Sequence, residues 1–400
     1  MKYDILIINA NTRKHGASQR IGIKDGKITA IGEDLEQDAA QIIDAEGNLV
    51  TESFVNGHLH LCKVFTLEMA GQGALGEYHT GGMGGAMTAI ERAADFKSCY
   101  DEKWIIGNVR EACNMALKHG NTHIRAFADV DQKARLEGVK ALIKGREEFK
   151  GKVELQVVAF PQDGIAREPG TEELMRQAME LGADISGGIP WMEYTKEEEQ
   201  SHLDFACNLA KEYDKGISML LDDVGDPEER TLEMLCKKSI EMGWQGRVTA
   251  QHCRAMELYN ENYFRKLVVL MKKAGIGLVS DPHTGPLHAR VKDLLLAGVP
   301  VALGQDDISD AYYPYGECNM LQIAFLASHL LWMTSFEDME LLYDMVTTSA
   351  AKVLGMKGHE LEVGGNADLV VLDQKDVWHA IWKHTPPVYV IKDGIDVTLR

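Results

Sequence analysis

His58-Leu59-His60 brings together two residues whose types and spacing could bind a metal ion. The pair ends an apolar run, residues 49–57, that is typical of a buried strand. Residues i and i+2 of a strand point to the same side, so the two imidazoles would converge on one point at the end of the strand. Imidazole is a common ligand of zinc and related divalent metals. For the pair taken alone, two unrelated histidines of the core or the surface are the alternative.

Polar residues also follow other strand-like segments, and their types fit the same chemistry. Asp306 comes just after residues 299–304, and His252 ends residues 248–252. Two histidines and an aspartate can hold one divalent metal ion, which would lower the pKa of a bound water. An aspartate beside that water can act as general base, while His252 could stabilise the attacking hydroxide or the developing oxyanion. With Gln162 to orient a ring carbonyl or amide, these are the parts of a metal-assisted hydrolase acting on a C–N bond.

The middle of the chain alternates strand-like and helix-like segments, and this alternation would position the polar residues. Helical segments such as residues 172–181 and 197–213 carry apolar residues at three- and four-residue spacing. The alternation predicts an α/β fold, a (β/α)8 TIM barrel. An open doubly wound sheet is the alternative, but its usual glycine-rich phosphate turn is absent after the first strand. The eight expected strands are residues 54–60, 122–128, 153–160, 185–189, 217–221, 248–252, 276–280 and 299–304.

In such a barrel, catalytic residues lie at the C-terminal ends of the strands. Acids at strand ends are also common helix caps, so one or two of them would mean little. Here six of the eight expected strand ends carry polar residues, which favours a site. They are His58 and His60, Gln162 and Asp163, Asp222 and Asp223, His252, Asp281 and His283, and Gln305, Asp306 and Asp307.

Both ends of the chain consist of short strand-like runs and tight turns. Asp25-Gly26 and Asp393-Gly394 each follow a strand-like run, and Asp-Gly in this position is a strong hairpin signal. Because chain ends often lie close together, we expect the termini to join in one small β-sheet domain. The predicted organisation is a composite sheet domain of residues 1–51 and 361–400 and a barrel of residues 52–360.

Composition argues against several classes of partner and location. The chain of 400 residues has a net charge of −19, with 45% hydrophobic and 26% charged residues, as in an ordinary globular protein. Such an acidic surface repels nucleic acid and anionic membranes, so we expect neither as a partner. We find neither a secretory signal nor an apolar stretch of the ~18 residues that a membrane span needs. The seven cysteines are scattered without CxxC spacing, which predicts a cytoplasmic location.

Several longer stretches resemble the amidohydrolase superfamily, and specifically its cytosine deaminase-like branch. The strongest are residues 157–164 (VVAFPQDG), 247–256 (RVTAQHCRAM) and 304–316 (GQDDISDAYYPYG), and residues 185–190 (ISGGIP) also match. The likeness covers nearly the whole length, including the split terminal sheet. The sequence is similar too to the triazine-degrading N-isopropylammelide amidohydrolases, which share the lysine after the His-x-His motif, here Lys63.

The resemblance implies a catalytic centre in which His58, His60 and Asp306 bind one divalent metal ion. Asp306 would also accept a proton from the metal-bound water, and His252 would contact that water. We therefore expect Asp306 and His252 to be catalytic, together with Asp223 on the fifth strand.

The resemblance also implies substrate contacts. Gln162 would bind the substrate ring, and Asp307 would position the ring or the loop after the last strand. Lys63 could contact the substrate or pair with an acid at the barrel mouth. Trp191 and Tyr312 could stack on a flat ring, and both are equally well explained as packing residues.

Five positions depart from the pattern of the family. Its fifth strand carries a metal-binding histidine in a His-Cys-Asp-Glu segment, where this chain has Leu220-Leu221-Asp222-Asp223. Leu220 cannot bind a metal, and Asp223 is shorter than the glutamate by one methylene. Gln305 replaces a histidine and Cys62 replaces an aspartate. The metal could be held with a substitute ligand such as His252 or Asp222, the site could lack metal, or it could be remodelled for another substrate.

The expected function is hydrolytic deamination, or amine removal, at a nitrogen heterocycle of pyrimidine or triazine type. The expected cofactor is one divalent metal ion, zinc or iron, with manganese as a further option. The alternatives are a metal-free relative that binds a heterocycle without turnover and a hydrolase that opens a cyclic amide. The resemblance suggests a homo-oligomer. A glycine-rich loop, residues 71–87, is either a lid over the ring or a flexible loop with packing contacts.

Overall fold

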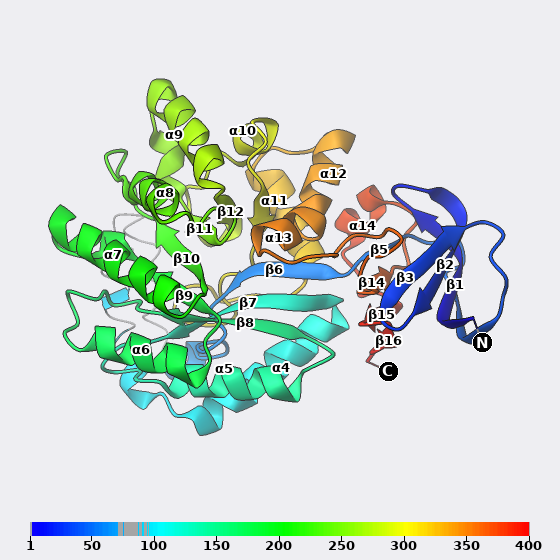
Figure 1. Ribbon diagram of the computed structural model, residues 1–400, viewed down its shortest axis with the longest axis horizontal. Coiled ribbons are helices and arrows are strands. Elements are labelled where there is room, and N and C mark those ends of the chain that lie inside the picture. Colours follow the sequence, from blue (N-terminus) through cyan, green and yellow to red (C-terminus); the bar gives the residue numbers. More distant parts are fainter. Residues whose placement is uncertain are drawn as a thin grey trace.

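The protein forms a large unit of strands surrounded by helices, with two smaller sheets beside it (Figure 1). The structure is a computed structural model that describes residues 2–70 and 96–399, together with residues 75, 87, 90, 91 and 94. Apart from residues 75 and 87, the glycine-rich loop of residues 71–87, for which a lid and a flexible loop were the two expectations, lies outside the described residues. Both ends of the chain lie at the smaller sheets (Figure 1).

Eight parallel strands follow one another around the large unit in chain order, which confirms the predicted (β/α)8 class. Their bounds agree with the expected strands to within about two residues because each strand is a short, continuously buried run. The strands are β6 (Phe54–Leu59), β7 (Asn121–Asp129), β8 (Glu154–Phe160), β9 (Ile185–Gly188), β10 (Gly216–Leu221), β11 (Val248–His252), β12 (Gly277–Ser280) and β13 (Val301–Leu303).

The barrel closes where β6 meets the residues that follow β13. The backbone N–H of His60 donates to the carbonyl of Asp306 at 2.8 Å, and that of Asp306 donates to the carbonyl of His58 at 2.9 Å. The Asn56 side chain reinforces this closure, since its Oδ1 accepts from the N–H of His58 at 3.2 Å and of Gln305 at 3.0 Å. Barrel closure therefore brings the His-x-His motif and Asp306 together through the backbone itself.

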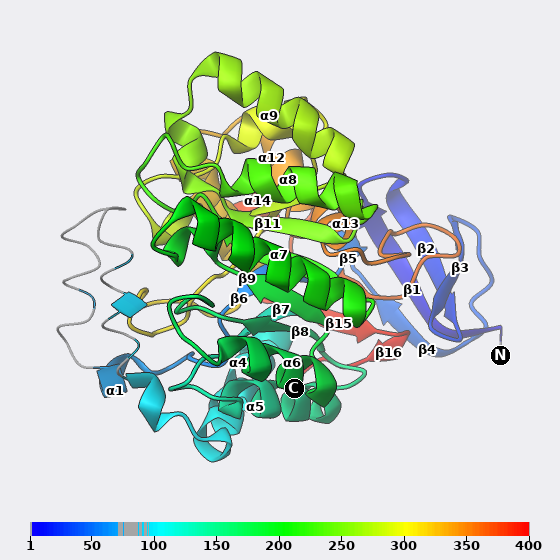
Figure 2. The same cartoon turned by 60° about the vertical axis from the view of Figure 1, so that its left-hand side comes forward.

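Amphipathic helices cover the outside of the barrel (Figure 2). None of the described helices combines the length and hydrophobicity that crossing a membrane would require. The helices are α1 (Leu67–Ala70), α4 (Glu102–Lys118), α5 (Glu137–Glu148), α6 (Thr171–Leu181), α7 (Lys196–Glu212), α8 (Thr231–Met242), α9 (Glu261–Ala274), α10 (Val291–Leu296), α11 (Met320–Leu330), α12 (Phe336–Asp344), α13 (Thr348–Val353) and α14 (Val377–Lys383). Short 3-10 turns are η2 (Lys97–Cys99), η3 (Pro190–Met192), η4 (Arg254–Leu258) and η5 (Pro282–Thr284).

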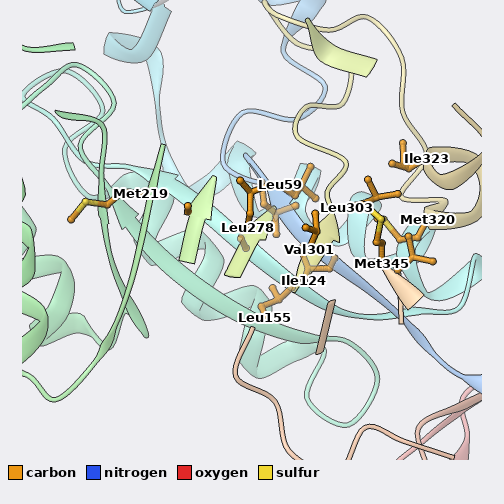
Figure 3. Packing of buried hydrophobic residues seen from close by; sticks show 14 of the residues in the cluster. Leu59, Ile124, Leu155, Met219, Leu278, Val301, Leu303, Met320, Ile323 and Met345 are labelled. Atoms are coloured by element: carbon orange, nitrogen blue, oxygen red, sulfur yellow. The ribbon is translucent and has the colours of Figure 1, made fainter. Parts of the chain in front are cut away.

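The main core lies between the strands and these helices. Figure 3 shows Leu59, Val301 and Leu303 from β6 and β13 near Met320 and Met345, and all five are fully buried. Burying a side chain of this size contributes about 1.5–3 kcal/mol. The core thus holds β6 and β13, the two strands that carry the candidate metal ligands, in fixed register.

The terminal segments form two four-stranded sheets, where we expected one. The first has the order β3-β2-β1-β4 and the second β16-β15-β14-β5, so β5 joins the N-terminal half to the C-terminal strands. Ile5, Ile21, Leu369 and Ile391 belong to one buried cluster that both sheets share. The bounds 1–51 and 361–400 remain a prediction. The strands are β1 (Tyr3–Thr12), β2 (Gly16–Lys24), β3 (Lys27–Gly32), β4 (Ala39–Asp44), β5 (Val50–Glu52), β14 (Leu369–Val371), β15 (Tyr389–Lys392) and β16 (Ile395–Asp396).

Candidate active site

Three predicted metal ligands meet at the closure of the barrel. His58, His60 and Asp306 are buried, and one donor atom of each lies within 4.8 Å of the others. The Nε2 atoms of His58 and His60 are 3.2 Å and 3.8 Å from Asp306 Oδ1. Ligands that bind one zinc ion at about 2.0–2.2 Å are separated by distances of this order.

The orientation of His58 leaves its Nε2 for a ligand. Its Nδ1 lies 3.0 Å from Gln251 Oε1, and Gln251 Nε2 donates to Ser218 Oγ at 2.8 Å. Because this second bond fixes the amide, Gln251 presents an acceptor and His58 carries its proton on Nδ1. The buried Nε2 of His58 then keeps its lone pair and has no hydrogen-bond partner among the described residues. Metal-binding histidines are typically held by such a bond on their other nitrogen.

His252 is the third histidine of the site. Its Nε2 lies 3.8 Å from Asp306 Oδ1, and its Nδ1 lies 3.3 Å from Asp281 Oδ2. His252 and Asp306 both adopt left-handed backbone conformations, with φ of 63° and 65°. Non-glycine residues held in this region are uncommon and cluster at functional sites. Burial, together with the charge of Arg254, lowers the pKa of His252 to about 3, so the imidazole is neutral at neutral pH.

The second oxygen of Asp306 is bound by the protein. Thr284 Oγ1 donates to Oδ2 at 2.6 Å, and Arg254 Nη2 lies 3.6 Å from it. Burial alone would raise the pKa of Asp306, but His252 and His58 outweigh it and hold this pKa well below its usual range. Asp306 is therefore an ionised carboxylate whose Oδ1 faces the three histidines.

The charge of the site suits a divalent cation. Asp223, Asp281 and Asp306 surround one guanidinium, that of Arg254, whose Nη1 lies 2.6 Å from Asp223 Oδ1. Burial, and then the charge of Asp306, raise the pKa of Asp281 well above its usual range. Nitrogen and oxygen donors of this kind fit zinc, iron or manganese.

A second cluster of metal-binding residue types has a different charge balance. His123, His359 and Asp368 place ligand atoms within 4.8 Å of one another. However, Lys392 Nζ lies 3.3 Å and 3.2 Å from the two carboxylate oxygens of Asp368. The ammonium already neutralises this carboxylate, so a metal ion would add uncompensated charge. The charge balance favours the cluster at the barrel closure as the metal site.

A cavity opens above the histidines and includes every predicted substrate residue. Lys63 Nζ donates to Gln162 Oε1 at 2.8 Å and lies 4.5 Å from the centre of the Tyr312 ring. Gln162 Nε2 donates to the Tyr312 hydroxyl at 3.2 Å. Burial would lower the pKa of Lys63, but Asp129, Asp307 and Asp310 raise it, so this residue is an ammonium. The cavity is lined by His60, Lys63, Ile90, Gln162, Trp191, Leu220, Asp223, His252, Arg254, Asp306, Asp307 and Tyr312.

Two further lining residues hold polar atoms without partners. Trp191 is 4% exposed, and its indole N–H has no hydrogen-bond acceptor among the described residues. Oδ1 of Asp307 is likewise buried and unpartnered. Burial, Asp310 and Asp306 raise the pKa of Asp307 well above its usual range. A bound ligand could satisfy both atoms, since buried polar groups are normally hydrogen-bonded.

The positions that depart from the family pattern have clear structural roles. Leu220 lines the cavity as a buried hydrocarbon wall. Asp222 points away from it, because its carboxylate accepts from Thr231 Oγ1 at 2.7 Å and from Tyr259 OH at 2.5 Å. Cys62 is buried, and its sulfur accepts from the N–H of Asp129 at 3.3 Å. Asp222 is therefore unavailable as a substitute ligand, and Asp223 is held by Arg254.

Sequence reasoning gave no role to three residues that shape the site. The position of Asp281 after β12 marked it as a polar strand-end residue. Its contact with His252 links two different strands, so the sequence pattern does not predict it. Arg254 and Thr284 carried no signal, since they lie in the short turns η4 and η5. Their significance depends on side-chain contacts that neither spacing nor hydrophobic pattern encodes.

One buried acid holds the loops that carry Gln162 and Trp191. Glu193 accepts hydrogen bonds from the N–H groups of Ile165 at 2.6 Å, Ala166 at 3.1 Å and Arg167 at 3.0 Å. Its Oε1 also lies 2.7 Å from His202 Nδ1. Burial acts to raise the pKa of Glu193, but these bonds lower it below its usual value. The carboxylate thus ties the loop after β8 to the turn η3.

Replacing Glu193 with alanine should lower the free energy of unfolding at pH 7 by about 3 kcal/mol, because three backbone donors lose a charged acceptor. Since the folded-state pKa is depressed, this stabilisation is present above the unfolded pKa of about 4.3 and is lost as pH falls through the folded value. Urea unfolding of both proteins between pH 3 and pH 7 measures the difference. A difference that grows as the solution becomes more acidic would refute this role.

The fold and the donor set together define a metal-dependent barrel hydrolase. Comparison with known proteins identifies the family, since the sequence profile described as "Amidohydrolase family" matches residues 41–395. The chain belongs to the amidohydrolase family, as its sequence stretches suggested, and is a hydrolase that acts on C–N bonds.

Individual relatives extend along nearly the whole chain. N-isopropylammelide isopropyl amidohydrolase from Pseudomonas sp. (strain ADP) is 32% identical over 98% of this chain and 96% of the relative. The structure of 5-methylcytosine deaminase from Klebsiella pneumoniae liganded with 5-fluorocytosine has a TM-score of 0.89 at 30% identity, covering 99% of this chain and 97% of that one. N-isopropylammelide isopropylaminohydrolase from Burkholderia multivorans has a TM-score of 0.85 at 26% identity, covering 98% of both chains.

Proposed function

We propose that the protein removes ammonia or a small amine from a pyrimidine- or triazine-type heterocycle by metal-dependent hydrolysis. The observation that carries the proposal is the meeting of His58, His60, His252 and Asp306 beside a cavity that the last three of them line. The named relatives support the choice of ring, since they are a deaminase with a bound fluorinated cytosine and two N-isopropylammelide hydrolases.

His58, His60 and Asp306 would hold the metal ion, which lowers the pKa of a bound water and polarises the carbon under attack. Asp306 is ionised and its Oδ1 faces the histidines, so it is placed to take the proton of the attacking water and return it to the leaving amine. His252 would contact either the metal or that water. Asp223, which lines the cavity and is paired with Arg254, would contact the substrate ring.

The substrate wall favours a ring that carries a carbonyl group. Because Gln162 Oε1 accepts from Lys63 and Nε2 donates one hydrogen to Tyr312, the second amide hydrogen could serve a ligand. The indole N–H of Trp191 has no acceptor among the described residues. Both are donors, and a ring carbonyl would accept from them. Tyr312 and Trp191 offer flat faces, and Asp307 would position the ring or the loop that it begins.

We also propose zinc or iron as the metal, with manganese as a further option, because His/Asp sites accept all three. All seven cysteines are free, which supports a cytoplasmic location. The acidic net charge of −19 supports a small-molecule substrate instead of nucleic acid or a membrane surface. The proposal of a homo-oligomer rests on the resemblance to the family.

A panel of amino-oxo-pyrimidines and amino-oxo-triazines, assayed for ammonia or amine release by the metal-loaded protein, tests the proposal. We expect turnover of at least one ring and a product in which an amino nitrogen is exchanged for oxygen. A product that gains water and retains its nitrogen would identify ring opening instead. Binding of these rings without any turnover would identify a silent relative.

A further inference from the structure

The protein lacks the ligand that the fifth barrel strand would supply, and no other residue of that strand end replaces it. Leu220 occupies the position, Asp222 is bonded to Thr231 and Tyr259, and Asp223 is paired with Arg254. If β10 gives no ligand, a replacement contact could come from a neighbouring strand. Of the next two strands in the sheet, β11 ends in His252, and Asp281 directly follows β12.

The imidazole of His252 is held between two buried carboxylates. Its Nδ1 lies 3.3 Å from Asp281 Oδ2, while its Nε2 lies 3.8 Å from Asp306 Oδ1, on the side where the Nε2 of His58 also lies. The rings of His58 and His252 are 4.8 Å apart at an angle of 68°. His58 therefore belongs to two sets of possible ligands, one with His60 and Asp306 and the other with His252 and Asp281.

The fold makes room for the acid on β12. A Cβ added at Gly304 would collide with Asp281 Oδ1 and would lie 2.6 Å from His58 Cβ. The Asp281 side chain is completely buried, and neither oxygen has a hydrogen-bond partner of good geometry among the described residues. Burying a carboxylate with so few hydrogen-bond donors is costly, and the His252 imidazole, whose Nδ1 lies 3.3 Å from Oδ2, could donate one.

We propose that Asp281 is a positioning residue that holds His252 as the fourth metal ligand, in place of the histidine that Leu220 has replaced. An Nδ1–H bond to Asp281 would leave the Nε2 lone pair of His252 facing the metal. Carboxylates that orient a metal-binding histidine in this way change metal affinity by about 10- to 100-fold. The inference rests on the proposed function, because it concerns the same metal.

A double-mutant cycle on zinc affinity tests the inference. Zn²⁺ binding is measured by competition with a chromophoric chelator for wild type, Asp281→Asn, His252→Ala and the double variant. We expect Asp281→Asn to weaken binding about 10- to 100-fold. The double variant should be no weaker than His252→Ala alone, because Asp281 acts through His252. Asp222→Asn is the matched control, since it alters a buried acid at the adjacent strand end, and its affinity should stay near that of wild type.

Cobalt substitution distinguishes a ligand from a residue that touches only the bound water. The visible absorption of the Co²⁺ protein should change on His252→Ala and shift toward that same spectrum on Asp281→Asn. The inference would be overturned if Asp281→Asn bound Zn²⁺ as tightly as wild type, or if the losses in the double-mutant cycle were additive. A cobalt spectrum unchanged in His252→Ala would overturn it too. Asp281→Ser serves as a second variant if circular dichroism shows that Asp281→Asn is unfolded.

The wild-type protein separates this inference from the proposed function. If wild type binds Zn²⁺ and releases ammonia while Asp281→Asn keeps its affinity, the inference alone fails. If wild type binds neither Zn²⁺ nor Co²⁺, the proposed function and the inference fail together.

Discussion

Replacing His58 with alanine should remove the bound metal ion and reduce ammonia release to the uncatalysed rate. His58 lies closest to Asp306 Oδ1, at 3.2 Å, and its other nitrogen is fixed by Gln251. Without the metal, neither the water nor the carbon under attack is activated. The expected loss is therefore the whole rate enhancement, about 10⁶-fold or more for an ordinary enzyme. Elemental mass spectrometry and an ammonia assay on the same preparation measure both effects.

The matched control for this variant is His359→Ala. It removes another buried histidine, from the cluster that Lys392 neutralises, and should retain about one metal ion per chain, as a single-metal site requires. Metal lost from His359→Ala but kept in His58→Ala would show that the metal belongs to the other cluster.

Replacing Asp306 with asparagine should reduce kcat by about 10²- to 10⁴-fold even at saturating metal, because the amide cannot take the proton of the attacking water. The change preserves shape and the contact of the side chain with Thr284, so folding should be little affected. Measuring kcat over a range of added metal separates the loss of the base from a weaker metal site. Asp222→Asn again serves as the matched control and should keep its kcat.

The account of Asp306 has a clear counter-result. If Asp306→Asn, fully loaded with metal, turns over within tenfold of the wild-type rate, then proton transfer is carried by another group. Asp223 would be the first candidate, since its carboxylate also lines the cavity.

The barrel was predictable from the sequence because its strands are short buried runs with polar residues at their ends. Residues 248–252 were expected as a strand and residues 172–181 as a helix; β11 has these bounds, and α6 begins one residue earlier. The joining of the two chain ends was less predictable. Asp-Gly turns marked the hairpins correctly, but which strands pair depends on long-range contacts, and β5 pairs with β14 rather than with β1 to β4.

The convergence of the candidate metal ligands could be predicted from strand-end position, because strand periodicity fixes where His58 and His60 point. The side chains that surround these histidines could not be predicted in the same way. Arg254 contacts Asp223, and Asp281 contacts His252. The orientation of these side chains depends on the left-handed backbone of residues such as His252 and on the space left by Gly304. Leu220 indicated that β10 offers no metal-binding side chain at the position used by the family, whereas only the structure shows which side chains of neighbouring strands lie nearby.

The most direct test of the central claim is to strip the purified protein of metal with a chelator and to restore zinc, iron(II) or manganese(II). Metal content and ammonia release from an active heterocycle are measured on the same samples. The account predicts that the stripped protein is inactive and that about one ion per chain restores turnover, as expected for a single catalytic site. Ammonia release that persists at full rate without metal, or a protein that takes up no metal, would contradict it.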